Sequence, residues 1–522
     1  QAHMSNLHKR ITELSPQQKA LLIERLSRRA ESQSGVRITR QPRERSAAFP
    51  LSLAQERLWF IDQIEPGSSA YNMSSIVSMT GALDVDKLER ALQEIVRRHE
   101  TLRVTFAEVD DKPRQLIAPN LALPVSLVDL QHLVEAEREA EAQRLAATDA
   151  RQPFDLRRGP LLRCTLLRLA ADKHLLLLTM HHIISDGWSM GVLLNELTAM
   201  YAAFSENRPS PVRELPVQYV DFAVWQRERL QGKILETELA FWKKQLADAP
   251  RHLEIPTDYP RPAEQSFRGA IELLTLSSVE VAALKELSRN EDVTLFMTLL
   301  ACLNLLLHQV TGSTDIVVGS SVANRNHLDT ENLIGLFVNQ LVLRTNMSGD
   351  PTFRELLKRI RQVTLSAYDH QDLPFQWLAR ALQPERSLSR NPLFQVTFAF
   401  QNLPPLVSES AGINWSLMGN DNETAQFDIN LLVSESEHEL CMAMQYSTDL
   451  FKAATIKRML RLLEVIARRI VENPDARLSS LNAELTAASE QLLRDERQER
   501  KAQNTGKIKS LRRRRSDQLA AH

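Results

Sequence analysis

The sequence is poor in the features that mark disulfide-rich, metal-clustered or membrane-anchored proteins. Only three cysteines occur in 522 residues, and the scattered positions of Cys164, Cys302 and Cys441 make neither a disulfide framework nor a metal cluster. No apolar run is long enough to cross a bilayer, and no signal peptide opens the chain. We therefore expect a cytoplasmic protein without a bound metal or a membrane partner.

An excess of charge of either sign is also absent. The chain holds 64 basic and 65 acidic residues, a formal net charge of -1, so no overall field recruits nucleic acid or membrane. An apolar content of 43% and a charged content of 25% are those of an ordinary globular protein. A chain of this length is expected to form two domains of similar size.

The most informative segment is MHHIISDGW, residues 180–188. It follows an apolar run of strand length and precedes apolar residues at helical spacing. His181 and His182 are therefore expected where a buried strand ends and a loop begins, which is a usual place for a catalytic side chain. A histidine, the nearby Asp186 and Gly187, which lets a substrate approach the backbone, fit an acyl-transfer site.

Other interpretations of this segment stay open on the residues alone. The two histidines can simply cap a buried strand. They can also bind a metal, but neighbouring residues at a strand end point to opposite faces and cannot readily share one ion. No cysteine or glutamate cluster nearby completes a zinc site. The same geometry means that one histidine of the pair, and not both, can face a given cavity.

The rest of the chain divides into two α/β halves of comparable size. Their similar order of elements predicts a pseudo-dimer of related lobes, although no sequence repeat is obvious. The predicted elements are a helix over 85–98 with Asp84 as its cap, a hairpin of 161–169 and 173–180, one helical stretch over 278–309, a strand over 315–322, a helix over 353–368, strands over 393–400 and 440–446, and a helix over 453–472.

Five parts are predicted along the chain. The first contains a helix start at Ser15 and a polar linker, and it is either docked on the main body or a docking element for a partner. The last ends in the basic KIKSLRRRR, which without aromatic residues favours a solvated linker to a following domain over a nucleic-acid arm. The parts are 1–48, a helical segment and linker; 49–220, the N-terminal lobe; 221–262, a connector; 263–485, the C-terminal lobe; and 486–522, the charged linker.

Seven segments match the sequence motifs of one protein family and occur in the same order as in that family. They are LSLAQERLWF (51–60), RHETLRVTF (98–106), MHHIISDGWS (180–189), YVDFAVWQ (219–226), IGLFVN (334–339), HQDLPF (370–375) and SRNPLF (389–394). Together they resemble the condensation domains of nonribosomal peptide synthetases. Their joint occurrence is far more specific than any one of them.

The resemblance implies an α/β fold and a reaction. Two chloramphenicol-acetyltransferase-like lobes are expected to form a V with a central tunnel. There an aminoacyl amine, carried by a downstream peptidyl carrier protein, attacks a donor acyl thioester to form an amide. The domain would hold no cofactor of its own, because the phosphopantetheine arm comes with the carrier protein. An adenylation domain is the other expected partner, nucleic acid is not one, and the excised domain is expected to be monomeric.

The resemblance also implies roles for the central motif. His182 is the expected catalytic residue, either as a base for the amine or as a group that positions it, since an α-amine with a pKa of about 8 is already partly neutral. His181 is expected to pack in the strand end, and Asp186 to hold the loop in shape by pairing with Arg103. At Gly187 any Cβ would crowd the substrates.

Four further residues are expected at the substrate tunnel. These are Trp188, Ser189, Phe337 and Asn339, the last two also at the bridge between the lobes, with plain packing as the alternative.

The donor and the subtype are less sharply indicated. The histidine pair excludes a heterocyclization domain, and Trp188 with Ser189 favours condensation over epimerization. The motif sequences are most similar to those of condensation domains that join an L-configured donor to an L-configured acceptor. Gln340 departs from these motifs, because threonine is commoner after the asparagine. If Met4 is the native start, the donor arrives in trans, which favours chain-initiating N-acylation from an acyl-CoA, as in lipopeptide biosynthesis, over a carrier-bound donor. A silent recruitment platform is a third hypothesis, against which the intact motif argues.

Overall fold

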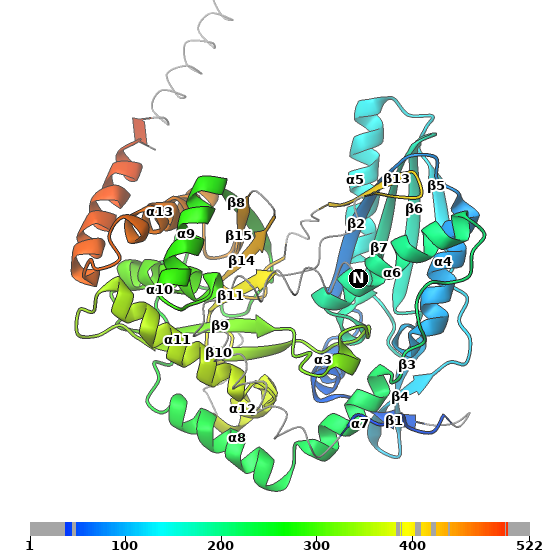
Figure 1. Ribbon diagram of the computed structural model, residues 1–522, viewed down its shortest axis with the longest axis horizontal. Coiled ribbons are helices and arrows are strands. Elements are labelled where there is room, and N and C mark those ends of the chain that lie inside the picture. Colours follow the sequence, from blue (N-terminus) through cyan, green and yellow to red (C-terminus); the bar gives the residue numbers. More distant parts are fainter. Residues whose placement is uncertain are drawn as a thin grey trace, which may run out of the picture.

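The computed structural model describes residues 37–43, 48–382, 387, 389–401, 409–418, 424–436, 439–495 and 497–498. In this part of the chain two α/β lobes lie side by side, each around its own sheet and hydrophobic core (Figure 1). The predicted architecture of two α/β lobes is confirmed. The helix start at Ser15 and the basic segment 507–515 lie outside the described residues.

The first lobe is built on a six-stranded mixed sheet with helices on both faces. Leu176 and Leu178 of β7 lie in the core beneath α4 and α6, whereas Leu177 packs with α5 on the other face. Burial on both faces explains the unbroken apolar run that leads to the two histidines. In sheet order the strands are β12 (Glu409–Ser410), β13 (Ile413–Met418), β2 (Asn72–Thr80), β7 (Lys173–His181), β6 (Leu162–Ala170) and β5 (Val125–Asp129), and the helices are α4 (Val85–Arg98), α5 (Glu135–Arg151) and α6 (Gly187–Ser205).

A small sheet and helix α3 (Leu53–Ile64) complete this lobe. Ser52 and Gln55 form a capping box at the start of α3, in which each side chain accepts the other's backbone N–H. The Gln55 side chain also donates to the Ile183 carbonyl at 3.1 Å, so α3 supports the loop that follows the histidines. The three strands are β1 (Ala48–Pro50), β4 (Lys112–Ile117) and β3 (Val104–Val109).

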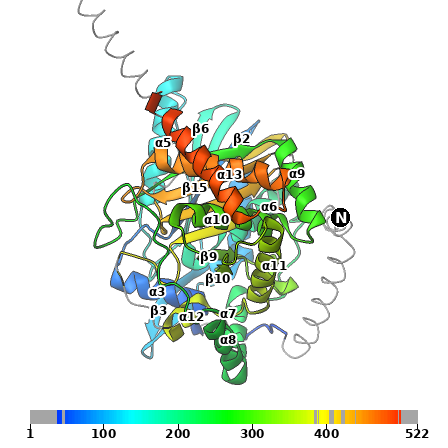
Figure 2. The same ribbon diagram turned by 90° about the vertical axis from the view of Figure 1, so that its left-hand side faces the viewer.

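Helices α7 (Tyr219–Arg229) and α8 (Gly232–Gln245) lead from the first lobe to the second. The second lobe also has a six-stranded mixed sheet, and its outer face is covered by helices (Figure 2). Its strands in sheet order are β10 (Asn339–Asn346), β9 (Asp315–Val322), β11 (Val396–Gln401), β14 (Ile429–Glu435), β15 (Leu440–Ser447) and β8 (Gly269–Leu276), and its helices are α9 (Ser278–Asn290), α10 (Leu295–Thr311), α11 (Phe353–Asp369), α12 (Phe375–Leu382) and α13 (Ala453–Glu472).

The predicted elements are largely confirmed, with two corrections. The single helix expected over 278–309 is two helices, α9 and α10, bent by 103°. Asp292 takes a left-handed conformation in the turn, and Thr294 then caps α10. Residues 486–495, expected as the start of the charged linker, are helical. Among the described helices, no single one is long and apolar enough to cross a membrane. The bent α9–α10 pair reaches that length and apolar content only when its two helices are counted together.

Two segments of the second half belong to the first lobe, so the boundary predicted for 263–485 is wrong for them. Strand β13 pairs antiparallel with β2, and its Trp415 packs edge-on against Tyr201 of α6 with ring centroids 5.5 Å apart. Leu333, Ile334, Leu336 and Phe337 also lie in the core of the first lobe. These long-range contacts join the lobes.

Residues 37–43, predicted as part of a linker, are docked on the first lobe. The Ile38 side chain is buried in its core, and Arg43 reaches two acidic residues of the lobe. We call residues 37–43 the N-terminal strap.

Candidate active site

His181 is the last residue of β7 and is buried. Its Nδ1 accepts the Ile183 N–H at 3.1 Å, and its ring packs against those of Tyr71 and Phe154. Desolvation, and secondarily the neighbouring His182, lowers the pKa of His181 to about 3. The ring is therefore neutral at working pH, and its surroundings are those of a packed side chain.

His182 begins the short 3-10 turn η2 (His182–Ile184) and is half-buried. Its backbone N–H donates to the Tyr71 carbonyl at 2.8 Å, and its Nδ1 lies 2.6 Å from the Ser185 carbonyl oxygen. A carbonyl can only accept, so Nδ1 carries the proton and Nε2 of the neutral ring keeps its lone pair. No described residue hydrogen-bonds to Nε2, which leaves this atom free to accept a proton from a substrate.

Asp186 is buried with 2% of its surface exposed and ties the histidine loop to the second half of the chain. Its Oδ1 accepts the Ser189 N–H at 2.8 Å, which caps α6, and lies 3.1 Å from Nη2 of Arg325. Its Oδ2 accepts the Phe337 N–H at 2.9 Å. With both oxygens used in this way, Asp186 has the contacts of a residue that holds the loop in place.

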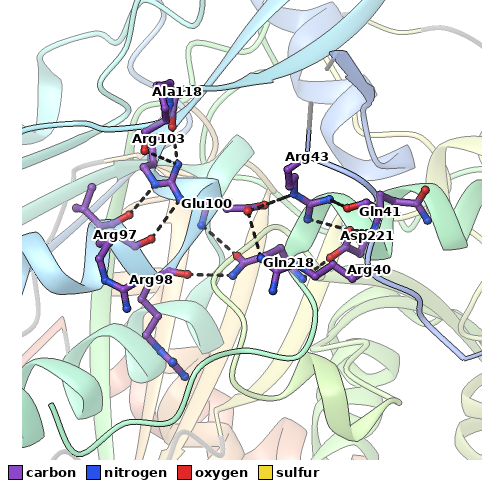
Figure 3. A network of polar contacts seen from close by, with 12 residues as sticks. Arg40, Gln41, Arg43, Arg97, Arg98, Glu100, Arg103, Ala118, Gln218 and Asp221 are labelled. Atoms are coloured by element: carbon purple, nitrogen blue, oxygen red, sulfur yellow. Dashed lines mark hydrogen bonds and ion pairs between the residues drawn. The ribbon is translucent and has the colours of Figure 1, made fainter. Parts of the chain in front are cut away.

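The predicted pairing of Asp186 with Arg103 is wrong. The Arg103 guanidinium donates to backbone carbonyls instead, at 3.1 Å to Val96, 3.2 Å to Arg97 and 3.3 Å to Pro119, and also to Ala118 (Figure 3). It thereby satisfies carbonyl groups at the C-terminal end of α4, which lack partners within the helix. Burial lowers the pKa of Arg103 from its ordinary value.

Arg325 takes the place expected for Arg103, and no motif in the sequence pointed to it. Its Nη1 donates to the carbonyls of Thr330 and Leu333 at 2.6 and 2.7 Å, and its guanidinium lies 4.1 Å from the Phe337 ring centroid. The side chain is 2% exposed. Arg325 thus shapes the segment 330–337 while it neutralises the buried Asp186.

The residues expected in the tunnel wall lie mostly in the packed junction between the lobes. Ser189 is fully buried and its Oγ contacts both the N–H and the carbonyl of Gly335, at 3.0 and 2.9 Å. Phe337 is 2% exposed and packs edge-on against Tyr219, with ring centroids 4.9 Å apart. Ser189 and Phe337 thus have the contacts of packed side chains, and their place at a substrate tunnel stays a prediction. Trp188 is half-buried, and its Nε1 donates to the Glu331 carbonyl at 2.9 Å.

Asn339 is buried and holds the HQDLPF segment to β10. Its Nδ2 donates to the carbonyls of Gln371 and Leu373, both at 2.8 Å, and its Oδ1 accepts the Phe375 N–H at 3.1 Å. These bonds use both hydrogens of the amide and one acceptor position of its oxygen, as the packing alternative predicts. A place of Asn339 in a tunnel wall stays a prediction.

Two glycines at the junction differ in what surrounds them. Gly187 is exposed, and apart from its chain neighbours and the backbone of its own helix no atom lies within 4 Å of where its Cβ would be. The crowding of substrates there therefore stays a prediction. At Gly335 a Cβ would come within 2.0 Å of the Tyr219 ring. Glycine is therefore required at 335 for the close approach of α7 to this segment.

Nothing in the described part of the chain resembles a metal centre. No group of three or more histidine, cysteine or acidic side chains there could hold an ion. The three cysteines are unpaired, and burial raises the pKa of the Cys164 and Cys302 thiols, which disfavours the thiolate.

Two lobes with mixed sheets, joined where an HHxxxDG loop meets a segment of the second half, define the condensation-domain fold. The family model of the condensation domain matches residues 46–493, and the chain belongs to this family.

Curated relatives are much longer proteins that contain a similar segment. The chain is 49% identical to one of the linear gramicidin synthase proteins of Brevibacillus parabrevis over 420 residues, 80% of this chain and 5% of that protein. It is 47% identical to a second protein of the same synthase, over 84% of this chain and 9% of that protein. The identity to chondramide synthase cmdD of Chondromyces crocatus is 43%, over 87% of this chain and 12% of that protein. The chain thus spans a small fraction of the relatives it matches.

Solved structures share the fold. The X-domain from teicoplanin biosynthesis is 28% identical, with a TM-score of 0.75 over 85% of this chain and 99% of that one. A four-domain nonribosomal peptide synthetase, holo-AB3403 bound to AMP and glycine, is 25% identical, with a TM-score of 0.75 over 84% of this chain and 34% of that one.

Proposed function

We propose that this domain forms an amide bond in nonribosomal peptide synthesis. The acceptor is the α-amine of an aminoacyl group on a carrier protein, and the donor is an acyl thioester. The observation that carries the proposal is the orientation of His182, whose Nδ1 proton is bound by the Ser185 carbonyl so that Nε2 remains an acceptor on a half-buried ring. Condensation-family membership supports the same reaction.

The reaction needs one proton acceptor, and the amine and the thioester must be held close to each other in a fixed orientation. The amine nitrogen attacks the thioester carbonyl, a carbon–nitrogen bond forms, and the amine proton passes to Nε2 of His182. The carbon–sulfur bond then breaks, and the leaving thiolate takes the proton from Nε2, which returns His182 to its starting form. His182 can alternatively bind the neutral amine and stabilise the charge that develops on it, because part of the amine is already unprotonated. Asp186 contributes through the loop that it holds, since its carboxylate is bonded to Ser189, Arg325 and Phe337.

The donor class is the second part of the proposal. An acyl-CoA donor would make the domain chain-initiating, and its product the start of a lipopeptide. A carrier-bound aminoacyl or peptidyl donor would make it an internal condensation domain. The similarity to segments of several linear gramicidin synthase proteins, each far longer than this domain, supports the carrier-bound donor. Carrier and adenylation domains would then be its partners, as the likeness to a four-domain synthetase also supports.

The test is amide formation by the full chain with a loaded acceptor carrier protein, followed by mass spectrometry. A panel of acyl-CoAs and carrier-bound aminoacyl donors identifies the donor class. We expect the wild-type chain to yield product and His182→Ala to lose about 10²-fold or more in rate, the usual contribution of a proton acceptor. His132→Ala, at an exposed histidine away from the site, is the matched control. A wild-type chain that forms no amide with any donor would support the silent recruitment platform instead.

A further inference from the structure

The N-terminal strap contacts the start of α7 through a cluster of buried acids (Figure 3). Nε of Arg43 lies 2.9 Å from Oε2 of Glu100, and Nη2 of Arg43 lies 2.9 Å from Oδ1 of Asp221. The backbone N–H of Gln41 donates to the same Asp221 oxygen at 2.8 Å. Arg43 therefore joins two carboxylates from separate elements of the first lobe.

These carboxylates depend on the strap for their counter-charge. Asp221 is fully buried and Glu100 is 7% exposed. Among the described residues Asp221 is paired with Arg43, and Glu100 with Arg43 and, at 4.0 Å, with the exposed Arg40. Removing one partner of such a pair leaves an uncompensated buried charge, which is far more disruptive than the loss of an exposed ion pair.

The same acids fix the first turn of α7. Oδ2 of Asp221 accepts the Gln218 N–H at 2.7 Å. The Gln218 side chain accepts the Glu100 N–H at 3.1 Å and donates to the Arg98 carbonyl at 3.0 Å. The start of α7 is thereby tied to the end of α4, with Arg43 between them.

The first residue of α7 carries this restraint to the histidine loop. The Tyr219 hydroxyl donates to the Leu336 carbonyl at 2.6 Å, and its ring fills the space that the missing Cβ of Gly335 leaves. The next residue, Phe337, donates its N–H to Asp186 at 2.9 Å. A continuous series of contacts thus runs from Arg43 to the residue that holds the His182 loop.

We propose that Arg43 is a positioning residue for amide formation: by joining Glu100 and Asp221 it fixes the start of α7, and Tyr219 passes this restraint through residues 335–337 to Asp186. The inference rests on the proposed function for its kinetic consequence, but its structural consequence is measurable without any activity. The strap is then part of the catalytic scaffold, and its docking sets how well the histidine loop is ordered.

The test compares four full-length proteins: wild type, Arg43→Met, Arg43→Met with Asp221→Asn, and Arg468→Met. Arg468 lies on α13 of the second lobe, 57% exposed, and pairs with Glu280 and Glu464, so Arg468→Met is the control for loss of an exposed arginine. Each protein is measured by hydrogen–deuterium exchange of the peptide over residues 334–338, by thermal unfolding, and by the kcat and KM of amide formation.

We expect Arg43→Met to speed exchange in 334–338 and to lower kcat about tenfold with little change in KM for the acceptor carrier, because misplacement of a reacting group affects the chemical step. Asp221→Asn removes one of the two uncompensated charges, that of the fully buried carboxylate, whereas Glu100 still lacks Arg43. The double variant should therefore recover part of both effects. Arg468→Met should match the wild type.

Unchanged exchange in 334–338 in the folded Arg43→Met protein would overturn the proposal, whatever its thermal stability. So would exchange in the double variant that is as fast as in Arg43→Met. If even the wild-type chain forms no amide, the proposed function fails, and the exchange data still decide whether Arg43 acts on residues 334–338.

Discussion

Asp186 and Arg325 lie 139 residues apart in the sequence and form an ion pair of 3.1 Å in which each side chain is 2% exposed. The pair connects the loop of His182 with the segment that the second half of the chain contributes to the first lobe. Both residues also bond Ser189, at 2.7 Å from Asp186 and 2.8 Å from Arg325. The conformation of the His182 loop and the junction between the lobes therefore depend on the same set of contacts.

Arg325→Met should be strongly destabilising, because it leaves the Asp186 carboxylate buried without its counter-charge. We expect the free energy of unfolding to fall by about 3–5 kcal/mol, as measured by urea denaturation. Arg468→Met, at an exposed ion pair, should change it by less than about 1 kcal/mol. In a double-mutant cycle with Asp186→Asn, additive effects would contradict the assigned pairing.

Arg103→Met tests which arginine pairs with Asp186: Arg103, as the sequence predicted, or Arg325, as the structure shows. Loss of the donors to the carbonyls of Val96 and Arg97 should lower the free energy of unfolding by about 1–3 kcal/mol. The rate of amide formation by the folded protein should stay as in the wild type, since Arg103 does not contact the histidine loop. A lower kcat in the folded Arg103→Met protein would argue against this assignment.

Gly335→Ala and Gly187→Ala form a matched pair. At 335 the added methyl group would overlap the Tyr219 ring, so we expect a loss of about 1–3 kcal/mol in unfolding free energy. At 187, the exposed first position of α6, the methyl group meets open space and should leave thermal stability equal or slightly higher. If substrates approach this glycine as predicted, Gly187→Ala should nevertheless slow amide formation. Full activity of Gly187→Ala would remove Gly187 from the substrate path.

His181 should make the folded protein sensitive to acid. Its pKa is lowered from 6.5 to about 3 in the folded state, so between these values the unfolded chain binds a proton that the folded protein does not. Its contribution is fully present above pH 6.5 and is lost as the pH falls toward 3, by up to about 1.4 kcal/mol per pH unit. His181→Asn keeps an acceptor but does not titrate, and urea denaturation at several pH values should show a shallower decline for it. Identical pH profiles would contradict the burial of a neutral ring.

Local signals in the sequence were sufficient for the elements that carry the central motif. The apolar runs of β6 and β7 with the tight turn between them, and the cap and apolar stripe of α4, are properties of short stretches and predict those elements directly. The break between α9 and α10 also has a local signal, since Thr294 caps the second helix, but the continuous apolar pattern outweighed it.

The contacts that complete the site are long-range and could not be predicted in the same way. Arg325 lies outside the seven motifs, and nothing near it in the sequence indicates that it meets Asp186. Motif membership also does not say whether a side chain faces a cavity, which is why Ser189 and Phe337 were expected at the tunnel but are buried in the junction. The tautomer of His182 likewise depends on the Ser185 carbonyl, whose position follows from the fold.

Strand β13 has a consequence for any attempt to divide this chain. A cut in the connector would separate β13 from β2, and the first fragment would present β2 as an open edge, while Trp415 would lose its place against Tyr201. An unpaired apolar edge is a site of aggregation. The two fragments should therefore be insoluble when produced alone and become soluble only when produced together. The two lobes would then fold as one unit.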